Sequence, residues 1–428
     1  MPASTTYQPE SPPFSSNTVS VIGAGVVGAC VALVLQRAGC KVSLIDALPP
    51  GSETSYGNAG LISVDSCLPI SLPGMVWQTP KWLLNRDGPL AVRPAYLPRM
   101  LPWLLKWLRA GRRERVLPAS AALHQLHRPA LNHYQNLLGA DAFADLIHVR
   151  GQLHLWENPS SSSAADRLID EIRRRQNITV KPLDAQAIAA LVPGLSAQLK
   201  HGICFEKHAH CINPQRMVQT LVDNFVREGG TLRHERVQRV QPLAGGGFRL
   251  WRNTGSLTAE RVVVAAGAHT PRLLAPLGIH LPLETERGYH VELPHARVPL
   301  QLPFIDKDRA VAVTPMEHGL RIAGTVEFAG LDYPPDSRRT EALLRIAGEL
   351  FPGINTEGAR SWLGFRPSTP DSLPIIDKVS RHPGLYVACG HGHTGLTGAP
   401  MTAQLMAHWV TGCAAEIDPS PYGLSRFN

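Results

Sequence analysis

The sequence lacks the features that mark membrane-spanning, secreted or disulfide-stabilised proteins. No stretch approaches the roughly 18 uninterrupted apolar residues of a transmembrane helix, because prolines and basic residues interrupt even residues 97–108. The 7 cysteines are an odd number and contain no C-x-x-C pair, which indicates a reducing compartment. Residues 1–17 are rich in Ser, Pro and Thr and lack the charged start and apolar run of a signal peptide. We therefore expect a disordered leader over residues 1–17 and a cytoplasmic protein.

The net charge of the chain is compatible with several classes of binding partner. The formal net charge of +8 suits nucleic acid, anionic lipid or anionic small molecules alike. Residues 81–84 and 103–115 interleave Trp and Leu with Lys and Arg, a pattern typical of segments at a membrane interface. Ordinary amphipathic helices of a globular domain would show the same pattern. A peripheral contact with the inner face of the cell membrane is therefore one prediction, and a solvated basic surface is its alternative.

The length of the chain predicts two closely packed domains, or one domain with a large insertion. A chain of 428 residues exceeds the size of a single ordinary core. Hydrophobic residues make up 44% of the chain, with 37 glycines and 37 prolines, which is the composition of a loop-rich enzyme and not of a disordered chain. Such a chain has room to bury a large cofactor.

A complete βαβ unit stands at the start of the folded chain. An apolar run over residues 18–22 precedes a G-x-G-x-x-G motif, a helical stretch follows to residue 38, and a second apolar run ends at Asp46. In this motif Gly23 permits the tight turn, Gly25 lets the backbone approach a pyrophosphate, and Gly28 allows helix and strand to pack. An acid such as Asp46 prefers a free ribose hydroxyl and disfavours NADP. FAD, NAD and a glycine-rich turn that binds nothing remain open at this point.

A second G-x-G-x-x-G pattern covers residues 390–395, after an apolar run over 385–389 and before a helical stretch over 396–410. A Rossmann unit needs a further strand after that helix, and no such strand follows in this sequence. The helix N-terminus is instead an anchor for negative charge, and the N1/O2 edge of a reduced flavin carries such a charge. One nucleotide fold with a separate anchor favours FAD over NAD. His391 and His393 form an H-x-H pair without further ligands, so we predict no metal site.

The rest of the chain alternates between helical and strand patterns. Helices are predicted over residues 119–138, 164–176, 214–228 and 338–351. Strands are predicted over residues 231–241, 248–252 and 261–265, and an antiparallel set over 289–293, 310–314 and 320–324.

Four separated motifs together resemble the D-amino-acid oxidase superfamily of FAD-dependent oxidoreductases. They cover residues 54–63, 287–290, 364–367 and 390–400, and their variants are most similar to bacterial D-amino-acid dehydrogenases and D-hydroxyproline dehydrogenase-like proteins. The resemblance implies an α/β and α+β fold, in which a discontinuous Rossmann-type FAD-binding domain carries an inserted substrate domain built on an antiparallel sheet. The FAD-binding domain would comprise residues 18–66, 205–282 and 355–428, and the substrate domain residues 67–204 and 283–354.

The resemblance also implies the cofactor contacts. The pyrophosphate and ribose would lie along the first glycine motif, the adenine against the backbone of Val237, and the flavin between residues 58–61 and the N-terminus of the last helix. The residues concerned are Gly23, Gly25, Val26, Val27, Gly28, Asp46, Ala47, Thr54, Ser55, Asn58, Ala59, Gly60, Leu61, Val237, Gly267, Gly395, Leu396 and Thr397. Ala266 stands where many relatives carry Thr.

Arg366 is the main substrate contact that the resemblance implies. The G-x-R-P arginine of the family binds the substrate carboxylate, and a guanidinium matches a carboxylate in bidentate fashion. The alternative for one arginine in a basic chain is a surface or structural role. Tyr289, His290 and His393 are the further catalytic candidates for contacts to the amine and the pocket, while a core role for the first two and a helix cap for His393 remain as alternatives.

The resemblance implies oxidative deamination of a D-amino acid. Hydride would pass from Cα to flavin N5, so no dedicated carbon base is needed, and a quinone or other respiratory acceptor would take the electrons. The expected substrate is a small D-amino acid or cyclic imino acid such as D-proline or cis-4-hydroxy-D-proline. One alternative is an oxygen-using oxidase of glycine or sarcosine. Another is a flavin-bearing assembly or nucleic-acid-binding subunit, although we expect no nucleic-acid partner.

Overall fold

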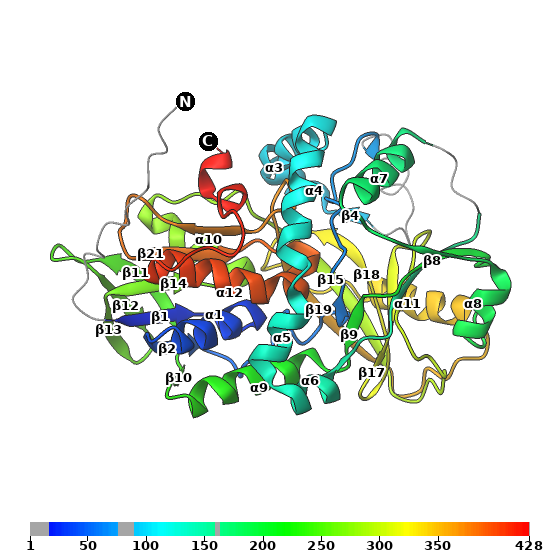
Figure 1. Ribbon diagram of the computed structural model, residues 1–428, viewed down its shortest axis with the longest axis horizontal. Helices are drawn as coiled ribbons and strands as arrows, with labels where there is room; N and C mark the ends of the chain where they lie inside the picture. The colour runs from blue at the N-terminus through cyan, green and yellow to red at the C-terminus, as the bar shows by residue number, and fades with distance from the viewer. Residues whose placement is uncertain (1–16, 76–89, 159–162, 428) are drawn as a thin grey trace.

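The computed structural model describes residues 17–75, 90–158 and 163–427, and they form two lobes, each built on its own sheet (Figure 1). The expected leader, except for Asn17, and the cationic segment 81–84 lie outside the described residues. No helix within the described ranges combines the length and the apolar character needed to cross a bilayer.

The first lobe contains a six-stranded sheet that is parallel except at one edge. Its strand order is β10-β2-β1-β14-β21-β20, and only β20 runs antiparallel to its neighbour. The strands are β1 Thr18–Ile22, β2 Lys41–Asp46, β10 Thr231–His234, β14 Arg261–Val264, β20 Ile375–Lys378 and β21 Leu385–Cys389. The predicted βαβ unit is confirmed, with α1 (Val26–Arg37) between β1 and β2.

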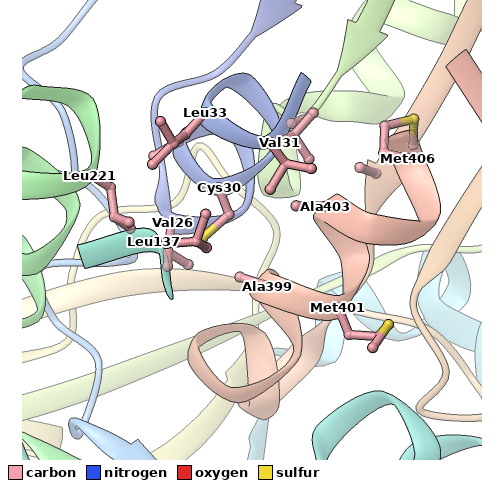
Figure 2. Close-up of a cluster of buried hydrophobic side chains, with 14 of the residues drawn as sticks. Val26, Cys30, Val31, Leu33, Leu137, Leu221, Ala399, Met401, Ala403 and Met406 are labelled. Atoms are coloured by element: carbon pink, nitrogen blue, oxygen red, sulfur yellow. The ribbon is translucent and has the colours of Figure 1, made fainter. Parts of the chain in front are cut away.

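Two helices pack closely beside this sheet. The helix α12 (Gly395–Thr411) lies along α1, and its small residues Ala399 and Ala403 face Cys30 and Val31 of α1 (Figure 2). Small side chains let two helix backbones approach each other closely, which buries both helices almost completely. The helix α9 (Pro214–Arg227) packs on another side of α1.

The helices between the two lobes differ from the expectation in two respects. The stretch predicted as one helix over residues 119–138 forms two, α4 (Arg113–His127) and α5 (Ala130–Leu138), because Pro129 separates them. We expected this region in the substrate domain. Its buried side chains instead join the core around α1 and α12, and the Tyr134 hydroxyl donates to the Leu396 carbonyl at 2.5 Å.

The second lobe contains a nine-stranded sheet in the order β19-β15-β18-β17-β16-β6-β8-β7, with β4 paired to β18. The helix α11 (Ser337–Leu350) covers part of one face. The strands are β4 Leu90–Val92, β6 Gln152–Trp156, β7 Lys181–Leu183, β8 His201–Phe205, β15 Glu284–Leu293, β16 Phe304–Asp306, β17 Val311–Met316, β18 Gly319–Phe328 and β19 Arg360–Ser368.

The antiparallel set predicted from the sequence is confirmed in β15, β17 and β18, whereas β19 differs from the expectation. Beyond residue 355 we expected the FAD-binding domain. All nine residues of β19 pair with β15 in the second sheet, because the chain crosses back only after Ser368. The strand that carries the G-x-R-P motif therefore belongs to the second lobe and lies at its edge, next to the first lobe.

Smaller elements complete the two lobes. A three-stranded sheet of β11, β12 and β13 extends the first lobe, and a second one of β3, β5 and β9 lies between the lobes. Their bounds, with those of the remaining helices, are β3 Leu61–Ile62, β5 Ile147–His148, β9 Ala209–Cys211, β11 Val237–Pro242, β12 Phe248–Arg252, β13 Gly255–Ala259, α3 Leu97–Ala110, α6 Ala140–Leu146, α7 Ala164–Arg175, α8 Ala185–Leu191 and α10 Thr270–Leu274.

Candidate active site

A cavity of about 490 Å³ opens at the carboxyl ends of the parallel strands of the first lobe. This edge is where open α/β sheets bind their ligands. Thirteen of the predicted cofactor residues line the cavity: Gly23, Gly25, Val26, Val27, Asp46, Ala47, Thr54, Ser55, Asn58, Val237, Gly267, Gly395 and Leu396.

The glycines of the first motif have different roles. Gly23 has φ +107°, and a Cβ there would lie 2.5 Å from the Ala265 carbonyl oxygen. A Cβ on Gly28 would lie 1.8 Å from the Gly23 carbonyl oxygen, so this glycine serves the packing of α1 and does not line the cavity. Gly25 faces the cavity, and a Cβ there would contact only Ser55 Oγ, at 3.4 Å. A bound pyrophosphate would therefore approach the backbone at Gly25.

Asp46 lies at the end of β2 with its carboxylate held by the backbone. Oδ2 accepts from the Ala24 amide at 2.6 Å, and Oδ1 accepts from the Leu48 amide at 3.0 Å. These bonds fix both oxygens at the rim of the cavity while leaving lone pairs for ligand hydroxyls. The arrangement fits a ribose.

The N-terminus of α12 reaches the same cavity through Gly395 and Leu396. Its free amides favour an anionic group there. The neighbouring Thr397 side chain is occupied, because its hydroxyl accepts from the Ser63 amide at 3.1 Å and ties the chain after β3 to α12. Together with Gly28, the predicted contacts Thr397, Ala59, Gly60 and Leu61 do not line the cavity.

Several lining residues were absent from the sequence prediction. Most of them lie at the ends of the parallel strands β1, β2, β10, β14 and β21 or directly after them, and the others sit on β11 or β19. The rule that ligands meet the carboxyl ends of parallel strands would have pointed to the first group. The additional residues are Ile22, Ile45, Leu48, Glu53, Glu235, Arg236, Gln238, Ala265, Ala266, Ala268, His269, Arg272, Leu273, Phe365, Pro367, Ala388, Cys389, His391 and Gly392.

The strand pair β15 and β19 arranges the predicted substrate residues. Glu286 is paired with Arg366, Gly288 with Gly364 and His290 with Trp362. Directly paired residues of antiparallel strands point to the same face, and their immediate neighbours point to the other. Arg366 and His290 therefore share a face, which is turned toward the first lobe, and Tyr289 lies on the opposite face.

The Arg366 guanidinium lies over Gly288, where a Cβ would come within 2.2 Å of Cζ. Nη1 donates to the Thr325 carbonyl at 3.2 Å, and the neighbours Phe365 and Pro367 line the cofactor cavity. Burial lowers the pKa of Arg366, and the negative charge of Glu286 opposes that shift. A cation with several N–H donors therefore stands beside the cofactor cavity.

Tyr289 is not brought together with Arg366. Its hydroxyl donates to Glu327 Oε2 at 2.7 Å and accepts from the Asp336 amide at 3.0 Å. Arg287 contacts the same carboxylate at 3.1 Å. Burial is the main cause that raises the pKa of Tyr289. The alternation of the strand thus places this side chain in the layer between the sheet and α11, where it stabilises the fold.

His290 lies on the substrate face but is held by the backbone of the loop 54–60. Nδ1 is 3.1 Å from the Gly57 carbonyl oxygen, and the ring stacks on Trp362 with centroids 5.2 Å apart. Burial, followed by the charge of Arg321, lowers the pKa of His290 to about 3. The ring is therefore neutral at physiological pH and positions the loop that contributes Thr54, Ser55 and Asn58 to the cavity.

His393 pairs with a carboxylate that the sequence analysis did not identify. Its Nε2 lies 2.6 Å from Oε2 of Glu286, and the imidazole is 41% exposed whereas the Glu286 side chain is 4% exposed. Burial raises the pKa of Glu286, but the charge and hydrogen bond of His393 and the charge of Arg366 outweigh this effect and hold it below its ordinary value. Neither the pairing of β15 with β19, which places Glu286 beside Arg366, nor the return of residues 391–394 to this point was visible in the sequence.

Comparison with known proteins gives one consistent family. The DAO family, described as FAD dependent oxidoreductase, matches residues 18–409. A D-amino-acid oxidase of Bradyrhizobium diazoefficiens is 34% identical over 416 residues, which cover 96% of this chain and 98% of that protein. D-amino acid dehydrogenases of Cereibacter sphaeroides and Rhizobium rhizogenes are 31% and 29% identical, each over 96% of this chain and 95% and 99% of those proteins.

Solved structures agree on the fold. Glycine oxidase from Geobacillus kaustophilus superposes with a TM-score of 0.70 at 23% identity, covering 95% of this chain and 98% of that one. L-proline dehydrogenase from P. horikoshii gives a TM-score of 0.73 at 18% identity, covering 96% and 98%. At these identities the likeness concerns the architecture alone.

Proposed function

Because the chain belongs to the DAO family of FAD-dependent oxidoreductases, we propose that it catalyses the oxidative deamination of a D-amino acid. The expected α/β fold and the expected cofactor FAD agree with this membership. The names of the curated relatives, D-amino-acid oxidase and D-amino acid dehydrogenase, support the substrate class. Which D-amino acid is oxidised and which electron acceptor is used are further parts of this proposal.

The cavity residues fit FAD. Gly25 and Val27 would bind the pyrophosphate with backbone amides, Asp46 the ribose hydroxyls, and Val237 the adenine. The Val26 amide donates to Ser55 Oγ at 3.0 Å, which fixes the loop 54–60 against the glycine motif. The amides of Gly395 and Leu396 would face the pyrimidine end of the flavin, where the helix N-terminus stabilises the negative charge of the reduced form. When bound, FAD supplies the acceptor for the hydride that leaves the substrate Cα.

One observation carries the substrate assignment. Arg366 is a buried cation on the same face as His290, which contacts the loop 54–60 that lines the cofactor cavity, so an anion bound by its guanidinium would lie on the side of that loop and of the flavin. A bidentate contact to the α-carboxylate would fix the position of Cα, and orientation is the main catalytic task in a hydride transfer. The residues around Arg366 thus act by binding and positioning.

The face next to Arg366 suits a compact substrate side chain, because a bulky one would meet groups already packed there. The Arg366 guanidinium covers Gly288, and the Trp362 ring covers Gly364. We propose a small or cyclic D-amino acid, with D-proline and cis-4-hydroxy-D-proline as first candidates, because the segment 287–290 resembles dehydrogenases of that substrate class. Glycine or sarcosine is the second candidate, since the same small face suits both and oxygen would then be the acceptor.

A quinone or other respiratory acceptor is the proposed partner, and α3 is the proposed docking surface on an anionic membrane. Along this helix Leu97, Leu101, Leu105 and Leu108 are between 37% and 49% exposed. Exposed basic residues stand beside and after them, namely Arg99, Lys106, Arg109, Arg112, Arg113 and Arg115. An apolar stripe with cationic flanks complements a surface of anionic headgroups over acyl chains.

The decisive experiment is anaerobic reduction of the purified flavoprotein. We expect flavin absorbance to bleach with a D-amino acid and not with its L-enantiomer, in a panel that includes D-proline, cis-4-hydroxy-D-proline, glycine and sarcosine. Bleaching by glycine or sarcosine alone would favour the second candidate. If no amine-bearing acid bleaches the flavin, the proposed function is wrong.

A further inference from the structure

Two features behind Arg366 have no role in the function proposed so far. The first is the Glu286–His393 pair, joined at 2.6 Å. The second is a cavity of about 40 Å³ lined by His393 and twelve other residues. The pair connects the substrate face of β15 with this small cavity, because Glu286 is paired with Arg366 on the substrate side while His393 belongs to the cavity wall.

Glu286 and Arg366 together match the charges of an amino acid zwitterion. They are directly paired residues on one face of the sheet, a position in which the Cβ atoms of antiparallel strands lie about 5 Å apart. A carboxylate bound by Arg366 therefore brings the ammonium group of the same molecule to the side on which Glu286 stands. Hydride transfer from Cα requires the neutral amine, since the nitrogen lone pair forms the new C=N bond. The ammonium must consequently lose a proton at this place.

The small cavity has the properties of a water site. Its volume exceeds the roughly 10–15 Å³ that a single water requires. His127 lines it, and its buried Nε2 has no hydrogen-bond partner among the described residues. Buried polar atoms in proteins are nearly always satisfied, so the His127 nitrogen indicates a bound water in this cavity.

The charged and titratable groups around the pair favour proton passage through His393. Arg366 on β19 faces Glu286, and Glu284 on β15 is engaged by the Tyr96 hydroxyl at 2.8 Å and lies near Arg99 of α3. Burial lowers the pKa of His127 to about 4 and that of His391 to about 3, so both rings stay neutral. They can bind water but do not compete for the proton.

Resting on the proposed function, we propose that the Glu286–His393 pair takes one proton from the substrate ammonium and passes it to water in the small cavity and on to solvent. The amino acid enters with NH₃⁺ and gives one N–H proton to the Glu286 carboxylate, and His393 carries the proton to the water. The Cα–H bond then breaks with its electron pair moving to the flavin, and the nitrogen lone pair forms the C=N bond. The amino acid is oxidised by two electrons, the flavin is reduced by two, and the iminium product leaves.

The first test is the pH dependence of anaerobic flavin reduction in Glu286→Gln, a variant that keeps the size of the side chain. General base assistance contributes about 100-fold or more, so we expect reduction at neutral pH to slow by about that factor. At a pH above the ammonium pKa of the substrate, the variant and the wild type should converge. His393→Asn should shift the acidic limb of the profile in the same direction.

The second test measures the proton itself. The compound 2-aminoisobutyrate has a carboxylate and an ammonium but no Cα hydrogen, so it binds without reducing the flavin. A pH-indicator dye should record proton release when the wild type binds it at neutral pH, and no release with Glu286→Gln. Glu284→Gln is the matched control, because Glu284 lies two residues away on the same strand and contacts Tyr96 instead of His393. This control should keep the wild-type profile and proton release.

The outcomes separate the two proposals. A wild-type pH profile and wild-type proton release in Glu286→Gln would overturn the proton outlet while leaving the D-amino acid function intact. Convergence of the two enzymes at high pH supports the outlet over a merely structural role, because a distorted pocket would stay slow at every pH. Absence of flavin reduction by every amino acid in the wild type would overturn both proposals.

Discussion

The guanidinium of Arg366 lies directly over Gly288, and a Cβ at that position would come within 2.2 Å of Cζ. The two residues belong to neighbouring strands, β19 and β15, and neither is the other's direct partner in the register. The absent side chain of Gly288 therefore creates the space in which the arginine lies flat against the sheet beside the cofactor cavity.

Gly288→Ala should displace the Arg366 guanidinium and weaken carboxylate binding. We expect KM for the amino acid to rise about 10- to 100-fold, corresponding to the roughly 1.5 to 3 kcal/mol of a charge-assisted contact. FAD content should stay at the wild-type level, because Gly288 does not line the cofactor cavity. Gly348→Ala, a helical glycine with no atom within 4 Å of a new Cβ, is the control and should leave KM unchanged. An unchanged KM in Gly288→Ala would show that the arginine has no such role.

Arg366→Ala should retain FAD and lose about 2 to 4 kcal/mol of transition-state binding, measured as the ratio of kcat/KM values. Arg366→Lys should recover only part of the loss, because an ammonium cannot form the bidentate contact. Catalytic efficiency at the wild-type level in either variant would contradict the assignment.

Substitutions at the second and third glycines of the first motif should affect different properties, cofactor binding in one case and folding in the other. Gly25→Ala places a methyl group in the cavity without a backbone clash, so we expect a folded protein that purifies with little FAD. Gly28→Ala forces a Cβ to within 1.8 Å of the Gly23 carbonyl oxygen and should lower the yield and the melting temperature. FAD content per chain and melting curves with added FAD measure both effects. Equal melting temperatures for the two variants would refute the distinction.

Lowering the pH should begin to destabilise the fold at pH values well above those at which carboxylates become protonated. Burial lowers the pKa of His208 and His210 to about 4, like that of His127, and the values of His290 and His391 to about 3. The unfolded chain binds protons near pH 6.5 and the folded one does not, so stability is complete above about pH 6.5 and falls as pH decreases toward 4. Each histidine contributes on the order of 1 kcal/mol at about pH 5.5.

Urea unfolding at about pH 7.5 and 5.5 measures this loss. His210→Asn should show a loss smaller by about 1 kcal/mol than the wild type, because one titrating group is gone. His318→Asn is the matched control, since this imidazole is 71% exposed, and its loss should equal that of the wild type. Equal stability of the wild type at both pH values would contradict the prediction.

Binding to anionic vesicles should depend on the exposed stripe of α3. We expect the wild type to cosediment with vesicles of phosphatidylglycerol and phosphatidylcholine, and Leu101→Asp with Leu105→Asp to remain in the supernatant. Replacing Arg112, Arg113 and Arg115 with Gln should reduce binding and its salt dependence. Leu191→Asp on α8, another exposed leucine at 37%, is the control. Failure of the wild type to bind would remove α3 as a docking surface.

Local patterns predicted most of the first lobe correctly. The strands β1 and β2, the helix α1 and the glycine motif follow from a contiguous 29-residue pattern of residues 18–46, because the periods of strands and helices are properties of neighbouring residues. The failure of the second glycine motif to form a nucleotide unit was also predictable, since a parallel unit needs a further strand. The pairing of β19 with β15 was not, because strand pairing depends on contacts between distant segments.

By itself the sequence determined the family, the cofactor class and the presence of an arginine suited to a carboxylate, since these depend on residue types in short motifs. Only the tertiary structure decided which candidates meet. It separates Tyr289 from Arg366 although His290, its neighbour, shares the arginine's face, and it brings Glu286 to His393 across 107 positions of the chain. The physical reason is that a strand alternates its faces at every residue while the sheet, and not the sequence, chooses which strands become neighbours.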